Sequence, residues 1–193
     1  MKVLGILGSP RKNGNCDLLI DEVLKGAASE GANIKKICLG DLDFKGCISC
    51  GGCDKTGVCV LKDDMTPIYN EIKEADAVAL ASPIYFAGIT SQLKAMIDRF
   101  QSEWVAKYIL RRSTKYEGRR TNKKGAFICV SGHQKDIFFK CARKPVAAFF
   151  KTMDIEFNDE LYFSGVEHAG DIRSVKGALG KAYKLGVKLA GKK

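Results

Sequence analysis

Residues 3–16 decide the fold: they read VLGILGSPRKNGNC, an apolar run followed by a polar segment with two glycines. The run 3–7 predicts a short buried strand, and the glycine, serine and proline at 8–10 predict a turn. From Asn15 onward the apolar residues follow helical spacing, and Gly31 stands where a helix C-cap is favoured. This stretch therefore predicts a strand that passes through a polar loop into an amphipathic helix.

The rest of the chain repeats this alternation of strand and helix. Further strands are predicted at 34–39, 77–81, 125–130 and 155–163. Further helices are predicted at 65–73, from about 89 to 100, at 137–151 and at 172–189. Because the strands are apolar on both faces and separated by helices, they predict a parallel sheet with helices on both sides. Five such strands in 193 residues predict one α/β domain over residues 1–193, with a flavodoxin-like doubly wound sheet.

The composition is that of an ordinary globular protein. Hydrophobic residues make up 46% and charged residues 28% of the chain, which excludes a disordered or fibrous protein. No apolar run approaches the roughly 18 residues of a membrane span. The apolar segment at the N-terminus is too short for a secretory signal and no cleavage site follows it. We therefore expect a soluble protein of the cytoplasm with no membrane partner.

The basic residues are concentrated in one segment, 107–124. This basic segment holds eight basic residues and one acidic residue, a net charge of +7 out of +10 for the whole chain. The basic residues are Lys107, Arg111, Arg112, Lys115, Arg119, Arg120, Lys123 and Lys124. Such a segment suits nucleic acid or an acidic protein partner, or it is a solvated loop that keeps the protein in solution. Since no nucleic-acid-binding motif accompanies it, we predict no nucleic-acid partner.

In a doubly wound sheet the ligand lies beyond the carboxyl ends of the strands. The loops that leave this edge begin at Gly8, Cys38, Ser82 and Ser131. The first of them precedes a helix N-terminus, which binds phosphate through free N–H groups and the helix dipole. It also supplies side chains that can donate to a phosphate, namely Ser9, Arg11, Asn13 and Asn15.

Three kinds of nucleotide-binding loop can be compared with this one. Five residues separate Gly8 from Gly14 and no Lys-Ser/Thr pair follows, so it is not a Walker A loop. It also lacks the Gly-x-Gly-x-x-Gly pattern of dinucleotide-binding folds, for which Asp41 is the one supporting feature. A loop rich in hydroxyl and amide groups suits the phosphate of FMN, and it equally suits a Ser-Pro turn with an asparagine helix cap. The loop alone leaves both interpretations open.

Eight cysteines in an intracellular protein need an explanation, because disulfides are rare in reducing compartments. Four of them crowd into residues 47–59 with the spacing C-x2-C-x2-C-x5-C. This is a tight form of the thiolate ligation used by cubane iron–sulfur clusters, and two glycines between the thiols let backbone N–H groups approach the sulfurs. Structural zinc is the alternative, although zinc usually takes two separated C-x2-C pairs. Four unligated thiols in one exposed loop would oxidise readily.

Three pieces of the sequence together resemble one known family. They are Gly8-Ser9-Pro10-Arg11 with Gly14-Asn15, the segment Ser82-Pro83-Ile84-Tyr85-Phe86, and the compact four-cysteine spacing. On these pieces the chain resembles the iron–sulfur flavoproteins of anaerobic archaea and bacteria, a branch of the NADPH-dependent FMN reductases. It departs from them at Cys16, where relatives typically carry Ser or Thr, and a thiol is a weaker donor to phosphate.

The resemblance implies a flavodoxin-like domain with a cysteine-rich loop inserted at residues 45–62. It implies an FMN whose phosphate is bound by the first loop and whose ring is contacted by the loop after the third strand. The residues so implicated are Ser9, Arg11, Asn13, Asn15, Cys16, Ser82, Pro83, Ile84, Tyr85 and Phe86. A 4Fe–4S cluster is implied on four ligands, Cys47, Cys50, Cys53 and Cys59. The resemblance further implies a homodimer or homotetramer and, in some members, ferredoxin as electron donor, which the basic segment would attract.

Some aromatic and histidine residues have two interpretations. Tyr85 and Phe86 either cover the flavin ring or belong to the core. His133, after the fourth strand, either serves the flavin or is a surface or structural residue. Trp104 and Tyr108 are expected at a subunit interface.

The function that follows from the resemblance is an oxidoreductase in which FMN and the cluster connect a one-electron donor to a two-electron acceptor. No catalytic side chain is predicted, because the sequence shows no nucleophile set and no general acid–base pair. Three other functions stay open: a pure electron carrier, an NAD(P)H-dependent FMN or quinone reductase whose cysteines hold structural zinc, and a nucleic-acid-binding module.

Overall fold

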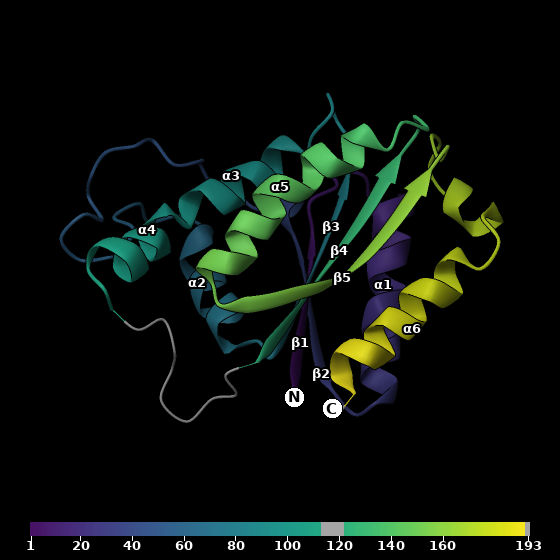
Figure 1. Cartoon of the computed structure of the whole chain (residues 1–193), viewed down its shortest axis with the longest axis horizontal. Helices are drawn as coiled ribbons and strands as arrows, with labels where there is room; N and C mark the ends of the chain where they lie inside the picture. The colour runs from purple at the N-terminus through teal and green to yellow at the C-terminus, as the bar shows by residue number, and fades with distance from the viewer. Residues whose placement is uncertain (113–121, 192–193) are drawn as a thin grey trace.

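The computed structural model describes residues 1–112 and 122–191, and one five-stranded sheet forms its centre (Figure 1). All neighbouring strands are parallel, in the spatial order β2-β1-β3-β4-β5. The strands are β1 (Lys2–Leu7), β2 (Asn33–Cys38), β3 (Ala77–Pro83), β4 (Lys123–Ser131) and β5 (Ile155–Ser164). This order confirms the predicted flavodoxin-like, doubly wound sheet.

Helices cover both faces of the sheet (Figure 1). The α-helices are α1 (Asn15–Ser29), α2 (Met65–Glu74), α3 (Ser91–Arg99), α4 (Gln101–Trp104), α5 (Ile137–Thr152) and α6 (Ala178–Ala190). Helices α1 and α6 pack against one face, and α2, α3 and α5 cover the other. Two glycines let α1 and α6 come close: a Cβ on Gly26 would lie 2.0 Å from the Tyr183 carbonyl oxygen, and one on Gly186 would lie 1.8 Å from that of Val23.

Alternate residues of the central strands point to opposite faces of the sheet, and both sets are buried. In β3, Val78 and Leu80 join the core beneath α2, α3 and α5, whereas Ala77, Ala79 and Ala81 pack beneath α1 and α6. The continuous apolar run that predicted this strand is therefore the signature of a strand with two buried faces.

The last predicted helix is shorter than expected. The prediction covers 172–189, but α6 begins only at Ala178. Gly177 precedes it with a φ of 73°, a left-handed conformation that interrupts a helix, and Ile172 lies in a separate 3-10 turn at Asp171–Ser174. The chain between β5 and α6 is consequently a longer loop at the carboxyl edge of the sheet than the sequence predicts.

The helix predicted to start near Ile89 begins at Ser91, after Thr90. The Thr90 hydroxyl oxygen accepts a hydrogen bond from the Leu93 N–H and caps the helix. Beyond α4 the chain forms a π-helical turn at Val105–Ile109. In the part of the chain that the structure describes, no helix is both long enough and apolar enough to span a lipid bilayer.

Candidate functional site

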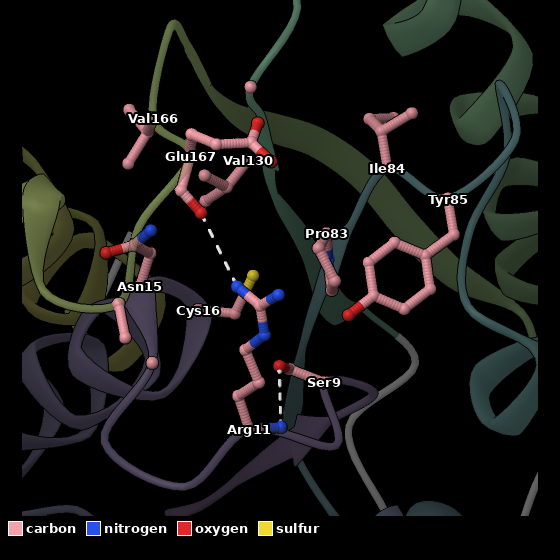
Figure 2. A pocket seen from close by; sticks show the side chains of 13 residues that line it. Ser9, Arg11, Asn15, Cys16, Pro83, Ile84, Tyr85, Val130, Val166 and Glu167 are labelled. Atoms are coloured by element: carbon pink, nitrogen blue, oxygen red, sulfur yellow. Dashed lines mark hydrogen bonds between the residues drawn. The ribbon is translucent and has the colours of Figure 1, made fainter.

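A pocket opens at the carboxyl edge of the sheet, beyond the ends of β1, β3, β4 and β5 (Figure 2). Its walls are Ser9, Arg11, Gly14, Asn15, Cys16, Pro83, Ile84, Tyr85, Val130, Gly132, Val166, Glu167 and Ala169. Seven of the ten predicted flavin residues are among them, and the other three, Asn13, Ser82 and Phe86, are not. The structure thus brings together two loops far apart in sequence, which we call the first loop (residues 8–14) and the third loop (residues 84–90).

The first loop is fixed to the sheet and to the start of α3. The Gly8 N–H donates to the Ala81 carbonyl oxygen at 2.8 Å, and the Thr90 hydroxyl donates to the Gly8 carbonyl oxygen at 2.6 Å. A Cβ on Gly8 would lie 2.8 Å from the Leu93 Cβ, so only glycine fits here without a shift of α3. The first loop is therefore held in place before any ligand is bound.

Ser82 is buried behind the pocket and does not line it. Its hydroxyl oxygen accepts from the Thr90 N–H at 3.1 Å, and its O–H donates to the Pro83 carbonyl oxygen at 2.8 Å. The Ser82 hydroxyl thus braces the third loop against the start of α3, and a contact of Ser82 with a flavin stays a prediction.

Arg11 lies across the pocket with its guanidinium directed toward the loop after β5 (Figure 2). Its Nη1 donates to the Glu167 carbonyl oxygen at 3.4 Å, a long bond that an anion could displace. Its backbone N–H donates to the Ser9 Oγ at 3.2 Å. Asn13 has a φ of 56° and is exposed, and its N–H donates to the Asp17 Oδ2 at 2.7 Å. Ser9 and Arg11 are therefore the polar side chains of the first loop that face the pocket.

Asn15 fastens the loop after β5 to the start of α1. Its Nδ2 donates to the His168 carbonyl oxygen at 2.9 Å. Its Oδ1 accepts from the N–H groups of Gly170 at 2.9 Å and Ile172 at 3.2 Å. The amide that was expected to donate to a phosphate is thus already engaged on both of its ends.

Cys16, where the chain departs from the family it resembles, is 2% exposed at the pocket wall. Burial raises the pKa of its thiol far above the ordinary range, and the Asp17 carboxylate adds to this. Cys16 therefore remains a neutral thiol, which is a weak hydrogen-bond donor.

The third loop contains a two-residue hairpin turn at Phe86 and Ala87. Tyr85 and Gly88 exchange backbone hydrogen bonds at 2.9 and 3.0 Å, and the φ angles of the two tip residues are 47° and 62°. Tyr85 is 40% exposed and lines the pocket, whereas Phe86 is fully exposed and does not. The interpretation of these aromatic residues as core is therefore wrong for both.

The loop after β5, residues 165–170, forms a wall that the sequence did not predict. We call it the fifth loop. The Val166 N–H donates to the Ser131 carbonyl oxygen at 3.0 Å, which aligns this loop with the end of β4. A Cβ on Gly132 would lie 1.6 Å from a Glu167 carboxylate oxygen, so glycine leaves room for this side chain. The strand order contained the signal, because the end of a fifth parallel strand reaches the same edge.

The pocket lining does not include His133, Trp104 or Tyr108, which also have a sequence-based interpretation. His133 is exposed and its ring meets the edge of Phe138 at 5.4 Å between centroids, which agrees with a surface residue. The ring centroids of Trp104 and Tyr108 are 5.6 Å apart, and the two residues are 40% and 41% exposed. Their place at a subunit interface stays a prediction.

The four clustered cysteines lie on one surface loop, residues 45–62, which we call the cysteine loop. All four are free thiols: Cys47 and Cys50 are exposed, and Cys53 and Cys59 are partly buried. Burial is the main cause that raises the pKa of Cys53. Across residues 1–112 and 122–191, no three Cys, His, Asp or Glu side chains are gathered closely enough to hold a metal ion. The donor set suits iron or zinc chemically, but the loop does not draw its thiols together by itself.

Three lysines of the basic segment are engaged at the C-terminal ends of helices. Lys107 donates to two carbonyl oxygens at the end of α5 at 2.7 and 3.1 Å, and Lys124 to two at the end of α6 at 3.0 and 2.8 Å. Lys123 does the same at the end of α2. Cations at these positions satisfy carbonyls that lack an intrahelical partner. Part of the charge of the basic segment is therefore structural. Lys115, Arg119 and Arg120 lie outside the described residues.

Sequence comparison relates the chain to flavin enzymes. A protein-family model described as "NADPH-dependent FMN reductase" matches residues 1–154. The chain is 46% identical over 99 residues to an iron–sulfur flavoprotein of Methanocaldococcus jannaschii, an alignment that covers 51% of each chain. It is 37% identical over 99 residues to one of Methanosarcina thermophila, covering 51% of this chain and 52% of that one. The chain thus spans about half the length of the curated relatives it matches.

Solved structures show the same fold. An NAD(P)H:quinone oxidoreductase from Methanothermobacter marburgensis superposes with a TM-score of 0.76 at 18% identity, covering 100% of this chain and 98% of that one. An FMN-dependent NADH-azoreductase from Bacillus anthracis, solved in complex with FMN, gives 0.70 at 18% identity, covering 99% and 100%. A flavodoxin from the domain Archaea gives 0.58 at 16% identity, covering 98% and 96%. These likenesses show the fold alone. The match of the family model over residues 1–154 shows the family: the chain belongs to the NADPH-dependent FMN reductase family.

Proposed function

We propose that this chain binds FMN in the pocket, carries a 4Fe–4S cluster on the cysteine loop, and transfers electrons between a one-electron donor and a two-electron acceptor. The observation that carries the proposal is the presence, on one flavodoxin-like domain, of a preformed pocket at the sheet edge and a separate loop with four free thiols. The names of the matching relatives, which are iron–sulfur flavoproteins, support it.

The first loop and α1 would bind the flavin phosphate. The first N–H groups of α1 have no partner inside the helix and lie at its positive end. Ser9 adds a hydroxyl, and Arg11 would exchange its long bond to Glu167 for a shorter, charge-assisted one. Asn15 and Cys16 add little, because the amide is engaged elsewhere and the thiol is a weak donor.

The apolar walls would enclose the ring of the flavin and keep water from it. They are Pro83, Ile84, Val130 and Val166, with Tyr85 at the margin. When bound, FMN supplies the exchange of one or two electrons, and no side chain of the pocket is required as a nucleophile. Glu167 adds a carboxylate that the sequence did not predict, and its charge would favour a flavin group that donates a hydrogen bond.

The cysteine loop would hold the cluster through Cys47, Cys50, Cys53 and Cys59. When bound, the cluster supplies the transfer of single electrons. Gly51 lies between the thiols with a φ of 69°, a conformation that glycine adopts without strain.

We extend the proposal to a ferredoxin-like donor, a homodimer or homotetramer, and the cytoplasm. The net charge of +10 supports steering of an acidic donor, and the exposed Trp104 and Tyr108 would suit contact with a second copy of the chain. The acceptor is left open within the proposal.

The test is to purify the protein without air and to measure bound flavin, iron and acid-labile sulfide. Cys50→Ala should lose the iron and keep FMN, and Arg11→Met should weaken FMN and keep the iron. Cys141→Ala, which removes an exposed free thiol outside the loop, is the matched control and should change neither. A colourless wild-type protein would reject both cofactors.

The identity of the recovered metal distinguishes the proposed function from its main alternative. Zinc in place of iron would favour an NAD(P)H-dependent flavin or quinone reductase with a structural zinc site, since four thiols serve either metal. Steady-state reduction of a quinone, oxygen or peroxide would exclude a pure electron carrier.

A further inference from the structure

The two ends of the cysteine loop are joined in a neck, formed by residues 43–45 and 61–64. The Asp43 N–H donates to the Asp64 Oδ2 at 2.7 Å, and the Asp64 N–H donates back to the Asp43 carbonyl oxygen at 3.3 Å. The Lys45 N–H donates to the Asp63 Oδ2 at 3.3 Å. The thiols therefore sit on a closed loop whose ends are fixed to each other.

Arg99, the last residue of α3, bonds to both sides of this neck. Its Nη1 donates to the Lys45 carbonyl oxygen at 2.8 Å and to the Asp63 Oδ2 at 2.6 Å. Its Nη2 donates to the Asp63 Oδ1 at 3.1 Å and to the Leu61 carbonyl oxygen at 3.4 Å. The guanidinium thus binds the carboxylate with both amino groups and bonds a carbonyl on each side of the neck.

The Arg99 side chain is fully buried, which is unusual for a charged group and makes its partners important. Within the described residues, its Nε has no hydrogen-bond partner. A buried guanidinium can neither be neutralised nor rehydrated without opening the surrounding structure. Opening of the neck would therefore be strongly unfavourable while the pair with Asp63 is intact.

The same arginine is also bonded through its own backbone and reaches the two segments that flank the thiols. Tyr69 from α2 donates its hydroxyl to the Arg99 carbonyl oxygen at 3.1 Å, and burial is the main cause that raises the pKa of Tyr69 to about 12. The two carbonyl groups that Arg99 bonds belong to Lys45, two residues before Cys47, and to Leu61, two residues after Cys59. The guanidinium is thus fixed to both backbone segments that lead into the proposed ligands of the cluster.

We propose that the Arg99–Asp63 pair is a clasp that closes the cysteine loop and positions its thiols for the cluster. Both are positioning residues, since the cysteines make the contacts to the metal. The inference rests on the proposed function as far as the cluster is concerned, while closure of the loop is a property of the chain alone. The charge of Arg99 also favours the more negative, reduced state of a bound cluster.

The experiment compares Arg99→Met, Arg99→Lys and Asp63→Asn with wild type. Arg143→Met is the matched control, because it removes an arginine of α5 whose ion pair with Glu160 is partly exposed and includes no residue of the cysteine loop. Flavin binding verifies the fold of each variant. Two readouts follow: the rate of tryptic cleavage after Lys55 in iron-free protein, and the rate at which reconstituted clusters lose iron to a chelator.

In Arg99→Met and Asp63→Asn we expect cleavage after Lys55 at least about tenfold faster than in wild type, because the closed loop opens more often. We expect iron affinity to fall by about 10- to 100-fold, the usual effect of removing a group that orients metal ligands. Arg99→Lys keeps the positive charge but lacks the planar guanidinium that bonds Asp63 with two amino groups. A cluster bound to this variant should therefore keep a near-native midpoint potential, whereas its loop should still be cleaved faster than that of wild type. Arg99→Met should shift that potential to a more negative value.

Equal cleavage and iron loss in Arg99→Met and Arg143→Met would overturn the clasp. If wild-type protein takes up no iron and sulfide at all, the cluster part of the proposed function fails, and the cleavage rates alone decide whether the loop is clasped. If Arg99→Met no longer binds flavin, Asp63→Asn and Arg99→Lys decide in its place.

Discussion

The pocket and the cysteine loop are held in different ways. The walls of the pocket are fixed at several independent points: Gly8 bonds to Ala81 and Thr90, and Asn15 ties the fifth loop to α1. The neck of the cysteine loop depends on one buried ion pair, Arg99 with Asp63, for most of its side-chain hydrogen bonds. The pocket is thus built together with the sheet, whereas the cysteine loop has a fixed neck and thiols that still have to be gathered by what they bind.

Among the substitutions in these two regions, Asp63→Asn should lower the free energy of unfolding the most. Removing one partner of a buried ion pair costs about 3–5 kcal/mol, because it leaves the other charge uncompensated. Burial by itself would raise the pKa of Asp63, but hydrogen bonds from Arg99 and from the N–H groups of Lys45 and Met65 outweigh it and hold the pKa below its ordinary value of 3.8. The clasp therefore stabilises the fold fully above about pH 4, and this contribution disappears as the pH falls through the lowered pKa.

Urea unfolding of iron-free wild type and Asp63→Asn between pH 6 and pH 3 measures the effect. The difference between the two free energies of unfolding should be largest at pH 6 and should shrink as the pH falls below about 4, because the unfolded carboxyl then takes up protons that the paired carboxylate resists. A gap that stays constant over this range would contradict the role of Asp63 as the charged partner of Arg99.

The sheet and its order could be predicted from the sequence because both faces of each central strand are buried. Val78 and Leu80 pack on one side and Ala77, Ala79 and Ala81 on the other, which leaves a continuous apolar run in the sequence. The start of α6 could not be predicted in the same way. Apolar spacing continues through Ile172, and the break depends on the φ of Gly177, a backbone choice that periodicity does not record.

The site was predicted at the level of loops rather than of side chains. The edge rule indicates which loops meet, and Ser9, Arg11 and Tyr85 do line the pocket. It cannot indicate which polar groups are already bonded within the protein, as the Ser82 hydroxyl is. Arg99 and Asp63 are 36 positions apart and belong to no motif, so their pairing was visible only in the structure.

Substitutions of Asn15 test how the walls of the pocket are held, and they should lower the free energy of unfolding less than Asp63→Asn does. Asn15→Ala removes two hydrogen bonds to the fifth loop and one to Ile172, and it should lower the free energy of unfolding of the flavin-free protein by about 1–3 kcal/mol. Asn15→Asp keeps the two bonds accepted from Gly170 and Ile172, so it should lose less. If Asn15 instead acted mainly as a phosphate donor, both variants would unfold like wild type without flavin, and Asn15→Asp would bind FMN more weakly than Asn15→Ala.

Substitutions at the hairpin tip should change the free energy of unfolding the least, and they should raise it. Phe86 and Ala87 both have positive φ, which favours Asn-Gly in a two-residue hairpin turn, so Phe86→Asn with Ala87→Gly should stabilise the protein by about 1 kcal/mol. Because the Phe86 side chain is fully exposed and outside the pocket, FMN affinity should stay near that of wild type, whereas Tyr85→Ala, at the pocket wall, should weaken it. Thermal unfolding and flavin titration measure the two effects separately. A more stable double variant that binds FMN poorly would mean that the tip folds over the flavin when it binds, and the pocket would then resemble the cysteine loop in being completed by its ligand.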